Sequence, residues 1–128
     1  METSDELEGV ELAVAVAIAD GGYRQIHEDG SIWWRWPSHS SSLISVSVKD
    51  YRPDLYLEQA WELDGEGWKW RFLERSEYLV VSIEGASGRH SIYQADVTWA
   101  DFPTKAQAYA TARCRAYLKA KGADNDNE

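Results

Sequence analysis

Three segments of the chain repeat their apolar residues every three or four positions, as helices do. The first predicts a helix over about residues 4–19. A second helix is expected to begin at Pro53, because the missing amide hydrogen of proline costs nothing in a first turn. A third, rich in alanine, is expected from Thr104 to about Lys121, with Gly122 ending it.

Between these helices, apolar and polar residues alternate with the period of two that strands show. The turn sequence Glu28-Asp29-Gly30 predicts a hairpin between its two flanking segments. The expected strands are 23–27, 31–36, 43–49, 68–74, 78–84 and 91–99. This order predicts an α+β fold: an antiparallel sheet of about five to six strands, with N-terminal, middle and C-terminal helices packed as a helix–sheet–helix sandwich.

The net charge of −9 is unevenly distributed. Residues 1–11 and 124–128 hold eight of the 22 acidic residues and no basic one, so 14 acidic and 13 basic residues remain between them. Residues 104–122 hold five basic residues and no acidic one. We expect one domain over residues 1–122 and a disordered acidic tail over 123–128. The near-neutral body favours a small anionic ligand over mimicry of nucleic acid, and direct nucleic-acid binding is not expected.

The sequence offers little catalytic chemistry. His27, His39 and His90 have no metal-ligand spacing, and no glycine-rich phosphate loop is present, so we expect no enzyme, metal or cofactor. The lone Cys114 excludes an internal disulfide and is expected in the core. Acidic first residues and an apolar run (12–19) too short to span a bilayer predict a cytoplasmic protein without a membrane partner.

Three segments, Glu11–Ile18, Pro53–Trp61 and Ala112–Ala116, together resemble the phage ABA sandwich domain, a family of small phage and prophage proteins. The resemblance implies a helix–sheet–helix sandwich and a phage protein that acts in the host bacterial cytosol. Some proteins similar to this family are anti-defence sponges, which sequester nucleotide signals such as cyclic ADP-ribose isomers made by Thoeris-type immunity.

The basic final helix is the first candidate site. Arg115 and Lys119 share a face, and Arg113 lies one turn from both Tyr109 and Tyr117, whose rings are placed to flank its guanidinium. Arginine pairs with phosphate and stacks on rings, as a nucleotide site requires. The predicted ligand-binding residues are Arg113, Arg115, Lys119, Tyr93 and Arg89. A structural role remains open, because basic residues near a helix C-terminus also complement the helix dipole.

A tryptophan-rich strand is the second candidate site. Trp33-Trp34-Arg35-Trp36 cannot all point inward, because neighbours alternate across a strand: either Trp34, or Trp33 with Arg35, faces away from the core. An exposed tryptophan indicates an interface. The predicted protein-binding residues are Trp33, Trp34, Trp36, Glu8 and Glu11.

Two functions follow from these sites. The first is a phage-encoded, non-enzymatic anti-defence protein that sequesters a small anionic nucleotide immune signal, cyclic ADP-ribose-like or a cyclic oligonucleotide, in pockets between the protomers of a homo-oligomer. The alternative is an acidic anti-CRISPR-type protein that inhibits a host defence complex by direct protein–protein binding.

Overall fold

The structure, a computed structural model, describes residues 9–36, 45–63, 68–84 and 92–126, with side chains to residue 122 in the last segment. The described helices are α1 (Gly9–Ala19), α2 (Leu57–Trp61) and α3 (Lys105–Asp126), with a 3₁₀ turn, η1 (Trp99–Asp101). One antiparallel sheet comprises β1 (Tyr23–Ile26), β2 (Ile32–Arg35) and β3 (Ser45–Ser47). The other comprises β4 (Lys69–Glu74), β5 (Tyr78–Glu84) and β6 (Ile92–Thr98).

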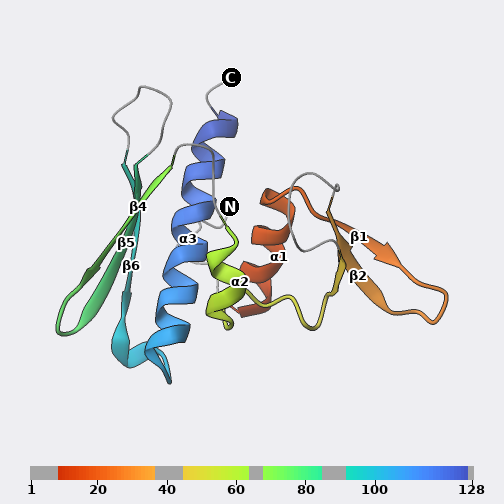
Figure 1. The fold of residues 1–128 in the computed structure, drawn as a ribbon, viewed down its shortest axis with the longest axis horizontal. Coiled ribbons are helices and arrows are strands. Elements are labelled where there is room, and N and C mark those ends of the chain that lie inside the picture. The colour runs from red at the N-terminus through yellow and green to blue at the C-terminus, as the bar shows by residue number, and fades with distance from the viewer. Residues whose placement is uncertain (1–8, 37–44, 64–67, 85–91, 127–128) are drawn as a thin grey trace.

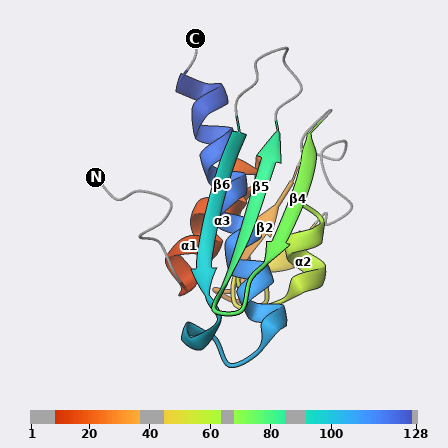
Figure 2. The ribbon, with the colours of Figure 1, turned by 90° about the vertical axis from the view of Figure 1, so that its left-hand side faces the viewer.

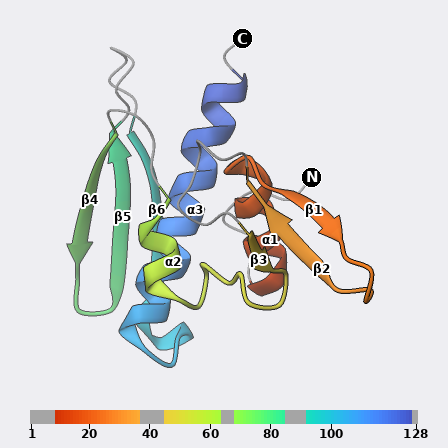
Figure 3. The same cartoon turned by 45° about the vertical axis from the view of Figure 1, so that its right-hand side comes forward.

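The two sheets lie on opposite sides of the helices (Figure 1). The β4-β5-β6 sheet packs on α3, which crosses behind it in Figure 2. On its other side α3 contacts α1 and α2, and α1 lies between α3 and the β1-β2 hairpin (Figure 3). The predicted α+β class is confirmed, but the single sheet of five to six strands is wrong. The layers run sheet, helices, sheet: α2 lies between β3 and β4 in the sequence, and the described strands of the two groups do not pair with one another.

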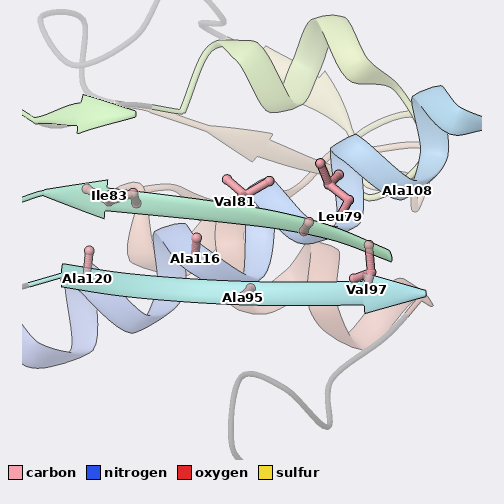
Figure 4. Packing of buried hydrophobic residues seen from close by; sticks show 9 residues of the cluster. Leu79, Val81, Ile83, Ala95, Val97, Ala108, Ala116 and Ala120 are labelled. Atoms are coloured by element: carbon pink, nitrogen blue, oxygen red, sulfur yellow. The ribbon is translucent and has the colours of Figure 1, made fainter. Parts of the chain in front are cut away.

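An alanine face of α3 forms the first core. Ala108, Ala112, Ala116 and Ala120 recur every four residues and are fully buried against β5 and β6 (Figure 4). Their small side chains let the helix backbone approach the sheet closely. The sheet contributes Leu79, Val81, Ile83, Ala95 and Val97. Each buried branched side chain contributes about 1.5–3 kcal/mol.

The opposite face of α3 joins a second core. Cys114 and Tyr117 pack against Leu12 and Val16 of α1 and against Leu63. The expected core position of Cys114 is therefore confirmed. Burial raises the pKa of its thiol well above the ordinary value, which keeps it protonated and unreactive.

Two element boundaries differ from the prediction. Gly122 has no left-handed backbone, and α3 continues through it to Asp126, so the predicted end at Gly122 is wrong and residues 123–126 belong to the helix. The middle helix begins at Leu57, because the residues after Pro53 form a turn in which two amides donate to the carbonyl of Arg52. The predicted start of the first helix near residue 4 lies outside the described residues.

Candidate functional site

A cleft of about 780 Å³ lies beside β6 and α3. Its lining residues come from four regions: Gly9; Arg52, Asp54 and Leu55; Asp96, Val97, Thr98, Asp101 and Phe102; and Gln107, Thr111 and Arg115. Gln107, Thr111 and Arg115 recur every four residues and so form one row along α3. The opposite wall is formed by β6, an edge strand of its sheet. The cleft is built from one chain.

A bidentate ion pair closes one end of the cleft. Nε and an Nη of Arg52 each donate to one carboxylate oxygen of Asp54, both at 2.9 Å. This hydrogen bonding raises the pKa of Arg52. The Thr111 hydroxyl donates to the Asp54 backbone carbonyl at 3.1 Å, which ties the ion pair to α3. Asp54 is buried, so its charge is balanced within the pair, while the guanidinium of Arg52 stays partly exposed.

The remaining charges of the cleft are of both signs. Arg115 contributes a second guanidinium from α3, and the exposed Asp96 and Asp101 contribute carboxylates. Phe102, half-buried, offers a ring among these polar groups. The cleft thus presents donors, acceptors and an aromatic surface to a polar ligand.

Arg113 lies in the interior, away from this cleft. Its Nε donates to the carbonyl of Ala60 at 2.7 Å, and an Nη donates to the carbonyls of Leu63 and Trp61 at 2.6 and 3.3 Å. The guanidinium carbon lies 3.6 Å from the ring centroid of Trp70 and 4.5 Å from that of Trp61. Arg113 therefore caps the carbonyl end of α2 and joins it to β4 and α3.

The rings that flank Arg113 are not those predicted. The sequence indicated Tyr109 and Tyr117, one turn away on the same helix, but the structure brings Trp61 and Trp70 from α2 and β4. The contacts of Arg113 are those of a structural residue, so it does not join Arg115 in the cleft.

The other predicted ligand residues are dispersed. Lys119, one turn beyond Arg115, donates its ammonium to the backbone carbonyl of Gln94 at 2.6 Å, at the outer edge of β6. Tyr93 packs on the core side of the sheet. Arg89 lies outside the described residues.

The structure shows which residues of the tryptophan-rich strand face away from the core: Trp33 and Arg35 do, and Trp34 does not. Trp34 and Trp36 are buried with Tyr51 and Ala17, so they are core residues and present no surface to a partner. Trp33, on the opposite face, stacks on His27 with 5.2 Å between centroids, and its indole nitrogen donates to Ser31 at 2.9 Å. Of the predicted interface residues, Trp33 is half-buried and Glu11 is exposed; Glu8 lies outside the described residues.

Sequence reasoning missed most of the cleft. The row that ends at Arg115 was detectable from its helical spacing, but the other walls come together only through packing between distant segments. Arg52 and Asp54 carried no recognisable motif.

Within the described parts of the chain, no three or more His, Cys, Asp or Glu side chains are grouped to hold a metal ion. No helix there is both long and apolar enough to cross a membrane. No protein-family model, curated protein or solved structure matches the chain. The resemblance to the phage ABA sandwich domain stays a prediction.

Proposed function

We propose that this protein is a non-enzymatic binding protein that holds a small anionic nucleotide in the cleft beside β6. The observation that carries the proposal is that Arg115 and Arg52 line one cleft together with Phe102. The volume of about 780 Å³ falls within the range typical of small-molecule sites, roughly 300–1,000 Å³.

Each part of a nucleotide has a counterpart in this cleft. Guanidinium groups pair with phosphate oxygens, and Arg115 contributes such a group to the cleft. Arg52, already paired with Asp54, adds the part of its guanidinium that stays exposed. Carboxylates accept hydrogen bonds from ribose hydroxyls, as Asp96 and Asp101 are placed to do. The ring of Phe102 offers a surface for a base.

The proposed biological role follows the family resemblance. A phage protein that retains a cyclic ADP-ribose-like or cyclic oligonucleotide signal lowers its free concentration in the host bacterial cytosol and so weakens the immune response. Retention requires tight binding and no turnover. The predicted homo-oligomer stays a prediction.

The test is to incubate the purified protein with a bacterial metabolite extract, remove unbound material, denature the protein and identify released nucleotides by mass spectrometry. We expect a released nucleotide from the wild type and at least about tenfold less from Arg115→Ala, which loses a phosphate partner worth about 1.4 kcal/mol or more. Arg71→Ala is the matched control, because this exposed arginine lies on β4, at the opposite edge of the same sheet. No released nucleotide, or equal release from both variants, would overturn the proposal.

A further inference from the structure

Four aromatic rings form a strip on the side of the molecule where α2, β4 and α3 meet. The strip comprises Trp61, Phe72, Tyr109 and Trp99, with successive centroids 5.3, 5.7 and 6.1 Å apart. Trp61 is 50% exposed and Phe72 is 36% exposed. Rings this large and this exposed exceed what the core requires, which is typical of an interaction surface.

The strip borders an outer strand, because among the strands that the structure describes β4 pairs only with β5. At the end of β4, the amide of Arg75 donates to the carbonyl of Tyr78 at 2.8 Å, so the backbone groups of Arg75 point toward β5. Successive residues of a strand alternate in this direction. The backbone N–H and C=O groups of Phe72 and Glu74 therefore point away from β5, toward the open edge.

This edge carries two basic side chains, Lys69 and Arg71, on the face of β4 opposite Phe72, but it lacks two other features that commonly block strand addition, a proline and a bulge. The six residues of β4 include no proline and pair with β5 in a continuous register without a bulge. A segment that pairs with Phe72 and Glu74 would extend the sheet, and every second side chain of that segment would project over the aromatic strip.

On the face that carries the strip, the carboxylates of Glu58 and Glu74 outnumber the ammonium of Lys105, which favours basic side chains there. Lys69 and Arg71 lie on the opposite face of β4, which favours uncharged side chains on that side of an added strand. Glu74 lies on the same face of β4 as Phe72, and its carboxylate accepts a hydrogen bond from the Tyr109 hydroxyl. Burial and this carboxylate together raise the pKa of Tyr109 to about 12. Glu58, three residues before Trp61 on α2, is exposed on the same side of that helix. The ammonium of Lys105 lies 5.4 Å from the ring centroid of Trp99, at one end of the strip. A lysine or arginine of a bound segment would make the same kind of cation–π contact with Trp61.

We propose that the aromatic strip and the free edge of β4 bind an extended basic segment of another protein. The segment pairs as an added strand with the backbone of Phe72 and Glu74, and its lysine or arginine side chains contact Trp61 and Glu74. Single-stranded nucleic acid also stacks on exposed rings, but the carboxylates beside the strip and the net charge of −9 repel its phosphates. The inference is independent of the nucleotide cleft, which lies at the opposite edge of this sheet.

The test uses an eight-residue synthetic peptide in which lysine alternates with valine, titrated against the full chain by calorimetry. We expect Trp61→Ala and Glu74→Lys each to weaken binding about tenfold or more, and Tyr23→Ala, which removes an exposed ring from β1 of the other sheet, to leave it unchanged. Glu74→Gln removes the charge at nearly constant shape and should have a smaller effect in the same direction. Circular dichroism of each variant checks that the fold is retained.

Two modified probes separate strand pairing from simple charge attraction. N-methylation of alternate peptide residues should abolish binding, because a methylated amide cannot donate to a strand edge, whereas the unmethylated peptide binds. A peptide with glutamate in place of lysine and an oligothymidine should not bind. The proposal is overturned if the basic peptide fails to bind, if the acidic peptide or the oligothymidine binds as well, or if Trp61→Ala and Glu74→Lys have no effect.

Discussion

At the scale of single residues, Arg113 is the clearest case of a basic residue with a structural role. Two of its three hydrogen bonds to backbone carbonyls are buried, so Arg113→Ala should lower the free energy of unfolding by about 3 kcal/mol or more. Arg113→Lys keeps the charge but loses the planar group between the indole rings, so its free energy of unfolding should lie between those of wild type and Arg113→Ala. Arg71→Ala, the matched change at an exposed arginine, should cost less than about 1 kcal/mol. Urea denaturation followed by circular dichroism measures all three, and equal losses from the two alanine variants would refute the structural role.

Asp20, at the end of α1, gives a second residue-scale prediction, in its pH dependence. Burial raises the pKa of its carboxyl above the ordinary 3.8, although the Tyr117 hydroxyl donates to it at 2.9 Å and partly opposes the shift. The folded state therefore holds this proton more tightly than the unfolded state, so ionisation of Asp20 costs stability as pH rises from 3.8 through the raised pKa. Asp20→Asn removes that dependence.

The stability of Asp20→Asn relative to wild type should consequently increase between pH 4 and pH 7, measured from urea midpoints. Asp29→Asn is the control with the opposite sign. Hydrogen bonds from Ser31 lower the pKa of Asp29, so the wild type gains stability from this group as pH rises through the lowered pKa to 3.8. The variant lacks that gain, and its comparison with wild type is therefore made below pH 4. Parallel trends in the two variants would contradict both assignments.

At the scale of elements, the sequence predicted which segments form strands better than how the strands pair. Tyr78–Glu84 has the predicted bounds, because small and polar residues border its apolar run in the sequence. The period of two shows which residues share a face, but it carries no information on which strand lies beside which. Trp34 and Trp36 point to a separate core under the first hairpin, and this core makes the second sheet possible. In the candidate site, only Arg115 was found from the sequence, since the other walls depend on that packing.

Gly122 gives a sharp test of the last element. No atom lies within 4 Å of a Cβ added at this position, and its backbone is helical, so Gly122→Ala should stabilise the protein by up to about 1 kcal/mol. If α3 ended at Gly122, as the sequence suggested, and this glycine took the left-handed conformation common after a helix, the same change would destabilise the protein. Gly21→Ala is the control: Gly21 has φ +91° in open space, and alanine there should destabilise by about 1–2 kcal/mol. Thermal melts of both variants distinguish the two signs.

At the scale of the whole molecule, α3 joins two of the three hydrophobic clusters, and the β1-β2-β3 sheet depends on the third. All four residues of β1 are exposed, whereas β5 buries every second residue against α3. Elements with few buried contacts open locally without global unfolding. We expect the amides that pair β1 with β2 to exchange with deuterium at least about 30-fold faster than those of β5, a difference of about 2 kcal/mol.

Two variants show whether the sheets are stabilised separately. Trp34→Ala removes the centre of the cluster that attaches β1-β2-β3 to α1, so it should accelerate exchange in β1 and β2 while β5 keeps most of its protection. Val81→Ala weakens the cluster that contains α3 and should accelerate exchange in both sheets, because α1 loses the layer on which it packs. Uniform loss of protection in Trp34→Ala would mean that the two sheets unfold as one unit. In that case α3 and α1 transmit stability through the whole molecule, and the hairpin is not a local opening unit.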